Sequence, residues 1–232
     1  VSHYRSNLRD IEFNLFEANR LQDYLDSEVW PGIDEDTARD ILIEMERLAT
    51  DGFAASYVDQ DRIPVELVDG EVKLPESVKR SADAFRDGGW DRFGLPEEMG
   101  GSPAPPSLVW ATQEMLLAAN TTAQFYSSAA LFAKVLFEEG TEEQKEFAGL
   151  WMAKGWAGTM ILTEPDAGSD VGAGTTKATD QGDGTWHIEG VKRFITGGEH
   201  DATENIIHLV LDRKSTRLNS SHSSVSRMPS SA

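Results

Sequence analysis

The spacing of apolar residues changes character once along the chain, near residue 155. Before that point, apolar side chains recur at the three- and four-residue intervals of an amphipathic helix. The segment after Asp34 gives the clearest pattern, with apolar residues at Ala38, Ile41, Leu42, Met45, Leu48 and Ala49. Gly52 is the expected end of this helix. Further helices are predicted at about 76–87, 107–119 and 121–139.

A capping box begins the next predicted helix. The Thr141 hydroxyl is suited to accept a hydrogen bond from the backbone of Gln144, whose side chain bonds back to the Thr141 backbone. The helix is expected to end near Gly155. Residues 1–35 are mixed in pattern and are interpreted as an N-terminal extension, so residues 36–155 form a predicted helical domain.

Beyond residue 155 the sequence consists of short β-favouring runs separated by turn signals. Asp183-Gly184 lies between two of these runs and predicts a hairpin. The fold class is therefore α+β, with an all-α domain followed by the start of a β-barrel or β-sandwich domain at 156–211, which we expect to be incomplete. The predicted strands are 160–162, 175–178, 185–188, 191–195 and 206–211.

Residues 212–232 differ in composition from the rest of the chain. They are rich in serine and carry four basic residues against one acid, whereas the whole chain has a net charge of −19. The segment resembles a translated sequencing adapter and is interpreted as a non-native tail. On this interpretation the native sequence stops at Leu211.

Composition limits the classes of function. The acidic charge disfavours nucleic acid and anionic membranes as partners. The absence of cysteine excludes a disulfide framework and thiolate chemistry. No apolar run reaches the length of a membrane span and the first residues do not form a signal peptide, so a cytoplasmic location is expected. No metal site is expected, because ligand spacing is lacking among His3, His187, His200 and His208.

The stretch from Thr163 to Asp170 carries the candidate chemistry. It reads Thr-Glu-Pro-Asp-Ala-Gly-Ser-Asp and follows the apolar run 160–162. Pro165 removes a backbone donor and Gly168 permits positive φ, which predicts an ordered loop. A buried strand that ends in hydroxyls, an acid and a tight turn is suited to hold a polar cofactor.

This stretch resembles the flavin-binding signature of the acyl-CoA dehydrogenases. A second block, Trp-His-Ile-Glu-Gly-Val-Lys-Arg-Phe-Ile-Thr at 186–196, follows at the spacing of that family. Residues 2–10 are similar to one bacterial branch with an extended N-terminus. The resemblance covers nearly all of residues 1–211 and implies an FAD-dependent oxidoreductase.

The implied reaction is the α,β-dehydrogenation of a fatty acyl-CoA thioester, in which an α-proton is abstracted and a hydride passes to flavin N5. By resemblance, Thr163 would serve the N1 and O2 edge of the flavin and Thr196 would bond near N5. Ser169 would contact the FAD pyrophosphate and the CoA ester, and Phe194 replaces the tryptophan of many members. The implied cofactor-binding set is Met160, Ile161, Leu162, Thr163, Ser169, Phe194, Ile195 and Thr196.

The general base of the family lies in a C-terminal helical domain that we expect to be missing from this chain. No catalytic residue is therefore assigned, and the chain as written is predicted to be inactive and to bind FAD poorly or not at all. Glu164 is expected to hold local backbone rather than to abstract a proton. The resemblance implies acyl-CoA as substrate, an electron-transfer protein as acceptor, fatty acid β-oxidation as pathway and a homotetramer for the full-length parent.

Other interpretations stay open at this point. Acyl-CoA oxidases and flavin monooxygenases of the same fold share parts of the signature, and a non-catalytic helical binding module is an alternative from another class. An apolar slot for the acyl chain has helical candidates whose spacing equally fits a plain core, which we favour for most of them. These candidates are Leu108, Met115, Leu116, Phe125, Leu131 and Phe132.

Overall fold

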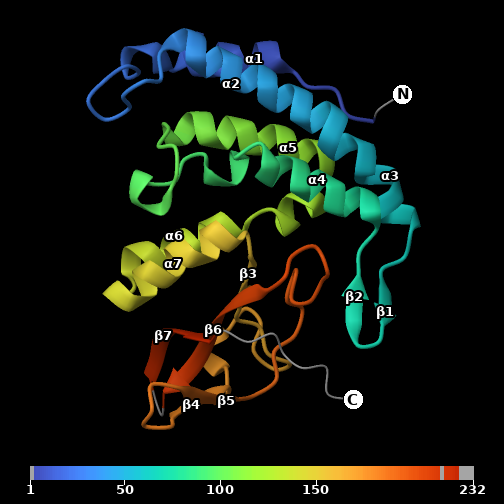
Figure 1. The fold of residues 1–232 in the computed structure, drawn as a ribbon, viewed down its shortest axis with the longest axis vertical. Coiled ribbons are helices and arrows are strands. Elements are labelled where there is room, and N and C mark those ends of the chain that lie inside the picture. The colour runs from blue at the N-terminus through green and yellow to red at the C-terminus, as the bar shows by residue number, and fades with distance from the viewer. Residues whose placement is uncertain (1–2, 215–216, 225–232) are drawn as a thin grey trace. The chain divides into compact units, whose positions relative to one another are not determined.

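The computed structural model describes residues 3–214 and 217–224 (Figure 1). It has the mixed α+β class that the sequence predicts. The chain divides into two compact units, which are Val1–Glu66 with Lys73–Ala130 and Leu67–Val72 with Leu131–Ala232.

The boundary between these units falls at residue 130, inside a helix, rather than near residue 155. A compact unit defined by contacts need not coincide with a domain, so the domain division stays a prediction. Its segments are 1–35, 36–155, 156–211 and 212–232.

The first unit is built from helices of several lengths. The α-helices are α1 (Leu8–Glu12), α2 (Glu35–Arg47), α3 (Ala54–Arg62), α4 (Glu76–Asp87) and α5 (Pro106–Tyr126). Wider π-helical turns occupy Phe13–Ala18 and Leu48–Phe53, and short 3₁₀ turns occupy Leu21–Asp23, Trp90–Arg92 and Glu97–Met99. Figure 1 shows α2, α4 and α5 running alongside one another in this unit.

Helix α2 forms where the apolar pattern predicts it. The Asp34 side chain accepts a hydrogen bond from the Thr37 backbone N–H at 2.8 Å and so caps the first turn. Ala38, Leu42 and Met45 are buried in the core of the unit. The predicted stop at Gly52 is wrong, because the chain continues through the π-helical turn Leu48–Phe53 directly into α3.

A buried group of neutral polar side chains holds the irregular turns of this unit. Asn120 donates to the Ser56 hydroxyl at 2.9 Å, and the Ser81 hydroxyl donates to the Gly52 carbonyl and to Ser56 Oγ, both at 2.8 Å. Ser56, Ser81 and Asn120 are each at most 2% exposed. These hydrogen bonds satisfy backbone and hydroxyl groups that the π-helical turn would otherwise leave buried and unpaired.

Asn120 also marks a break inside α5. Its backbone leaves the helical region, with φ −163° and ψ 95°, and its side-chain oxygen accepts from the Ala123 N–H at 3.1 Å. The break predicted between residues 119 and 121 is therefore confirmed. The helix predicted at 121–139 contains a further break, because α5 ends at Tyr126 and α6 spans Ala129–Glu139.

The segment between α3 and α4 forms a small hairpin. Its strands are β1 (Glu66–Val68) and β2 (Glu71–Lys73), which pair in a two-stranded sheet. Asp69 and Gly70 both have positive φ, 50° and 85°, as the tight primed turn of a hairpin requires.

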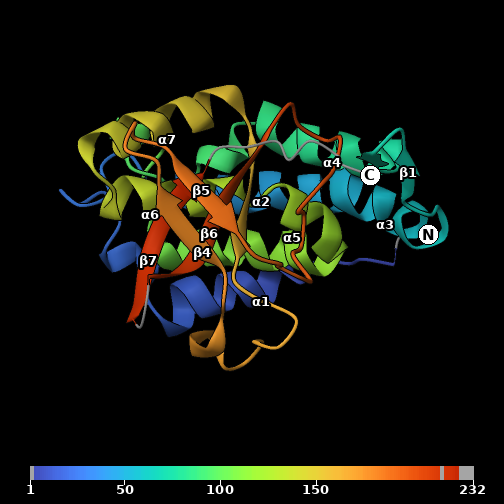
Figure 2. The ribbon, with the colours of Figure 1, turned by 90° about the horizontal axis from the view of Figure 1, so that it is seen from below.

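The second unit combines helices and short sheets. After α6 come α7 (Glu142–Lys154), β3 (Ala157–Ile161), a 3₁₀ turn (Val171–Ala173), β4 (Lys177–Asp180), β5 (Trp186–Glu189), β6 (Ile206–Lys214) and β7 (Arg217–Ser224). β3 pairs parallel with β6, which pairs antiparallel with β7, and β4 pairs antiparallel with β5. Figures 1 and 2 both show the β4–β5 hairpin beside β6.

Helix α7 and strand β3 meet through an aromatic ring on a glycine. The predicted capping box of Thr141 and Gln144 is present, and Gly155 ends the helix in the left-handed region. The fully buried Trp151 ring lies 2.5 Å from the position a Cβ on Gly158 would take. Only a glycine at this strand position lets the ring pack so closely.

Several strand predictions need correction. The hairpin at Asp183-Gly184 is confirmed, but residues 191–195 form no strand, because Phe194 has a φ of 59° that an extended chain does not allow. The predicted buried run 160–162 is wrong in part: β3 ends at Ile161 and Met160 is 44% exposed. Strand β6 passes the predicted native end at residue 211 and continues to residue 214.

The remainder of the predicted tail, residues 215–216 and 225–232, lies outside the described residues. Among the described residues, no helix has the length and hydropathy that a membrane crossing requires.

Candidate functional site

The loop after β3 is a tight turn closed by two backbone hydrogen bonds. The Glu164 N–H donates to the Ala167 carbonyl at 3.0 Å, and the Ala167 N–H donates back to the Glu164 carbonyl at 3.2 Å. Pro165 and Asp166 take the two exposed corners of the turn. Proline suits the first corner because its fixed φ matches that position. The ordered loop predicted from the sequence is thus confirmed.

The Glu164 carboxylate is the centre of this region. It is 5% exposed and accepts from the Thr175 N–H at 2.6 Å, the Thr175 hydroxyl at 2.9 Å and the Thr176 N–H at 2.9 Å. The prediction that Glu164 holds local backbone is confirmed. Its contacts fix the loop after β3 to the chain that enters β4.

A lysine completes the set of donors around Glu164. Lys192 Nζ lies 3.0 Å from Glu164 Oε1 and 2.9 Å from the Leu162 carbonyl oxygen. Burial opposes ionisation of Glu164, but the donors of Thr176, Thr175 and Lys192 outweigh it and hold the pKa of this carboxyl well below its usual range. The carboxylate therefore stays charged and is a poor proton acceptor.

The two sequence blocks of the candidate site meet at one backbone hydrogen bond. The Arg193 N–H donates to the Thr163 carbonyl oxygen at 3.0 Å. This bond places the end of β3 beside the segment that begins with Phe194. The proximity of Thr163 to the second block is therefore found in the structure.

Phe194 combines strain with exposure. A φ of 59° in a bulky aromatic residue costs about 1–3 kcal/mol and is uncommon outside functional turns. The side chain is 86% exposed, so packing of its ring does not offset this cost. Met160, on β3, is 44% exposed as well. The site thus presents an aromatic ring and a thioether that the described residues leave largely uncovered.

The other predicted site residues differ in exposure. Ile161 is buried, and Leu162, Thr163 and Ile195 are partly buried. Ser169 and Thr196 are exposed, so their hydroxyls are accessible to a ligand. Lys192 has no place in the predicted set. The residues around it predicted a strand, and one sequence carries no signal that this lysine turns inward.

The candidates for an acyl slot divide into two groups. Leu108, Met115 and Leu116 are at most 1% exposed and belong to the core of the first unit, as the plain-core interpretation expected. Phe125 and Leu131 are 52% and 58% exposed, and Phe132 is partly buried.

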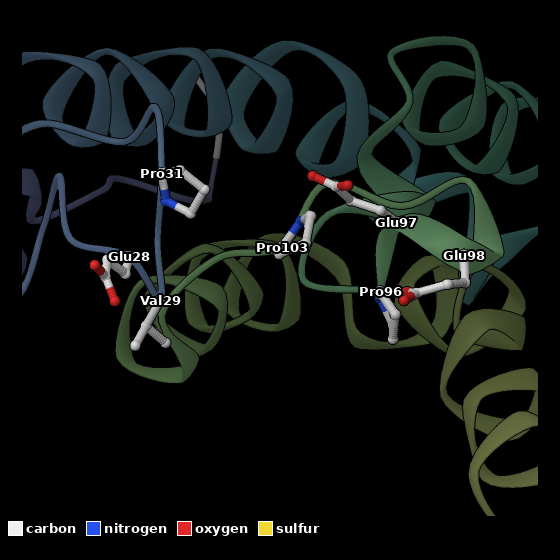
Figure 3. Close-up of a pocket in the computed structure, with 7 residues that line it drawn as sticks. All are labelled: Glu28, Val29, Pro31, Pro96, Glu97, Glu98 and Pro103. Atoms are coloured by element: carbon white, nitrogen blue, oxygen red, sulfur yellow. The ribbon is translucent and has the colours of Figure 1, made fainter.

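A separate hollow of about 420 Å³ lies in the first unit (Figure 3). None of the predicted site residues lines it. In Figure 3 the three carboxylates lie apart rather than pointing at a common centre, and the described residues contain no group of acids and histidines that could hold a metal ion. The lining residues are Glu28, Val29, Pro31, Pro96, Glu97, Glu98 and Pro103.

Comparisons with known proteins point in one direction. Residues 159–226 match the family model described as acyl-CoA dehydrogenase, middle domain. The broad-specificity linear acyl-CoA dehydrogenase FadE5 of Mycobacterium tuberculosis is 51% identical over 216 residues, which cover 92% of this chain and 35% of that protein. The 3-methylmercaptopropionyl-CoA dehydrogenase of Ruegeria pomeroyi is 36% identical over 90% of this chain and 36% of its own length.

A solved structure agrees with these relatives. The butyryl-CoA dehydrogenase from Megasphaera elsdenii superposes with a TM-score of 0.56 at 27% identity, covering 76% of this chain and 45% of that one. The chain spans about a third of the length of the two curated relatives. Because its similarity to them extends over nine-tenths of its own residues, the chain belongs to the acyl-CoA dehydrogenase family.

Proposed function

We propose that this chain carries the flavin-facing part of an FAD-dependent acyl-CoA dehydrogenase. The observation that carries the proposal is the hydrogen bond from the Arg193 N–H to the Thr163 carbonyl at 3.0 Å. This bond brings together two blocks that were assigned to the same cofactor from sequence alone. Relatives named as acyl-CoA dehydrogenases over most of the chain support the same reading.

The residues at this site suit a flat aromatic cofactor. The exposed parts of the Met160 and Phe194 side chains are apolar and polarisable. Thr163 and Thr196, which follow them by three and two residues in the sequence, add hydroxyl groups. An isoalloxazine ring has both an apolar face and a polar edge, so it matches this mixture. When bound, the flavin would supply the acceptor for a hydride from the β-carbon of an acyl thioester.

The residues of this chain would bind and orient rather than transfer protons. Met160, Phe194 and Ile195 would contact the ring, and Thr163 and Thr196 would direct hydrogen bonds to its polar edge. Ser169 would bind the pyrophosphate and the CoA ester. Glu164 is unsuited as general base because four donors hold it ionised. We therefore assign no catalytic residue in the described part of the chain.

The partners follow from the proposed reaction. The substrate would be an acyl-CoA thioester and the acceptor an electron-transfer protein, in fatty acid oxidation. A homotetramer for the whole protein and a cytoplasmic location are further parts of the proposal that no contact in this chain supports.

The test uses the complete protein that contains this chain. It is expected to purify with FAD and to lose the flavin's visible absorbance when an acyl-CoA is added without oxygen. Phe194→Ala should weaken FAD binding by about tenfold, the equivalent of one lost ring contact of about 1.4 kcal/mol. A colourless protein that takes up no added FAD would refute the proposal. Reoxidation by oxygen as fast as by an electron-transfer protein would instead favour an acyl-CoA oxidase.

A further inference from the structure

One buried charge in the second unit has no role in the proposed chemistry. The side chain of Lys192 is 12% exposed, and its ammonium contacts the Glu164 carboxylate at 3.0 Å and the Leu162 carbonyl at 2.9 Å. Leu162 and Glu164 are the two neighbours of Thr163 in sequence. The lysine therefore contacts the residues on both sides of Thr163, which is a predicted cofactor-binding residue.

The residues after Lys192 continue this alignment. Arg193 donates its N–H to the Thr163 carbonyl at 3.0 Å, and Phe194 follows directly. Residues 192 and 193 are thus fixed against residues 162–164 by three hydrogen bonds. Anchors at several points determine the direction of a segment as well as its position.

The conformation of Phe194 requires such an anchor. A non-glycine residue in the left-handed region persists only where its surroundings determine it. Phe194 is 86% exposed and its ring supplies little packing of its own, so contacts of the neighbouring residues hold its conformation. Lys192 and Arg193 make such contacts on the N-terminal side, and on the C-terminal side the Gly198 N–H donates to the Ile195 carbonyl at 3.1 Å.

We infer that Lys192 is a positioning residue which, through Glu164 and the Leu162 carbonyl, sets the turn that presents Phe194 and Thr196 beside Thr163. The inference rests on the proposed function for the identity of the ligand, a flavin. The positional part concerns only this chain. Lys192 touches neither cofactor nor substrate in this role, and it acts by holding a strained turn in one conformation.

The experiment compares three variants of the 232-residue chain. Lys192→Met keeps most of the stem volume and removes the charge and the donors, and Lys192→Arg restores both. Lys177→Met removes an exposed lysine of β4 in the same unit and serves as the matched control. Amide hydrogen exchange at residues 190–198 and in β3 is measured for each. FAD is then titrated into the complete protein carrying the same changes while the visible circular dichroism of the flavin is recorded.

Lys192→Met should speed exchange at the Arg193 amide by about tenfold, as expected when a buried hydrogen bond is lost, with β3 changed by less than about threefold. Lys192→Arg should return most of the protection, and Lys177→Met should behave as the unvaried chain. The complete protein should lose affinity for FAD and induced flavin dichroism with Lys192→Met, and it should regain both with Lys192→Arg.

Two results overturn the inference. One is unchanged exchange at 190–198 in Lys192→Met, and the other is an equal increase in β3, which would indicate a purely global role. The expected exchange pattern together with no flavin signal from the complete unvaried protein supports the positioning role and counts against the proposed cofactor. Failure of the two proposals is therefore distinguishable.

Discussion

The two units bury polar side chains for different purposes. In the first unit Ser56, Ser81 and Asn120 are neutral, and their hydrogen bonds serve backbone groups released by a π-helical turn and a helix break. In the second unit Glu164 and Lys192 are charged, and their contacts hold loops rather than helices.

The difference lies in what each group supports. The neutral side chains lie in the helical core of the first unit. Their role is to supply hydrogen bonds to backbone groups that irregular turns leave unpaired in that core. Lys192 of the charged pair precedes the strained, exposed Phe194 by two residues. A charged pair is costly to bury and gains little stability over apolar packing, so its presence close to Phe194 in the chain points to a requirement for position.

Loss of charge at Glu164 should have the largest effect. Glu164→Gln replaces one acceptor oxygen with an NH₂ group that faces existing donors, and it leaves the Lys192 ammonium without its counter-charge. We expect the second unit to lose about 3 kcal/mol of stability, as for other broken buried pairs. Urea unfolding measures the change, and Glu189→Gln on the exposed face of β5 is the control. If Glu164→Gln lowers the free energy of unfolding no more than Glu189→Gln does, the Glu164–Lys192 pair contributes no more than an exposed ion pair.

Removal of Asn120 should cost somewhat less. Asn120→Ala deletes the donor to Ser56 and the cap of the Ala123 N–H, and leaves both groups buried. A loss of about 2 kcal/mol is expected for a missing cap and an unsatisfied hydroxyl. Thr121→Ala, at an exposed neighbouring site, is the control. If Asn120→Ala and Thr121→Ala lower the free energy of unfolding equally, the buried hydrogen bonds of Asn120 do not have the role given to them.

These two groups also mark the limit of what one sequence predicts. Helix α4 and the capping box at Thr141 were predicted at their observed positions, because local spacing and capping chemistry determine them. The stop predicted at Gly52 was wrong because its carbonyl finds Ser81, a residue far along the chain. Tertiary contacts of this kind leave no local pattern.

The candidate site was predictable in part, since the ordered loop and the role of Glu164 in holding backbone were both predicted. The convergence of Thr163 with the second block followed from family resemblance, and the contact with Arg193 agrees with it. The strand predicted at 191–195 was wrong because Lys192 contacts Glu164 and Phe194 takes a φ of 59°, which an extended strand does not allow. In contrast, the hairpin at Asp69-Gly70 had a readable local signal that the sequence analysis passed over.

Relief of strain at Phe194 should have an effect of opposite sign. Phe194→Gly removes the cost of a positive φ, and after the entropy that glycine adds to the unfolded chain we expect a gain of about 1 kcal/mol. FAD binding should weaken in the same variant. Val191→Gly, exposed and without positive φ, should give no gain in urea unfolding. A destabilised Phe194→Gly variant would mean that the ring, despite its exposure, supports the fold.

The buried pair of Thr159 and His208 gives the smallest expected effect. It bears on the contrast between neutral and charged buried groups, because its imidazole is neutral at high pH and becomes charged when acid protonates it. The Thr159 hydroxyl and His208 Nδ1 lie 2.6 Å apart between paired positions of β3 and β6, and burial lowers the pKa of His208. The folded state therefore disfavours the proton, so the stability linked to His208 is complete above the unfolded pKa near 6.5 and is lost as pH falls through the folded pKa. Urea unfolding between pH 8 and 5 should show a small loss in the unvaried chain that His208→Asn abolishes and His187→Asn, at an exposed site of β5, retains. Stability that is independent of pH in this range would mean that the pair stays neutral in both states, as Ser56, Ser81 and Asn120 do. The predicted loss would instead mean that acid weakens β3, the strand that leads into the Glu164 turn.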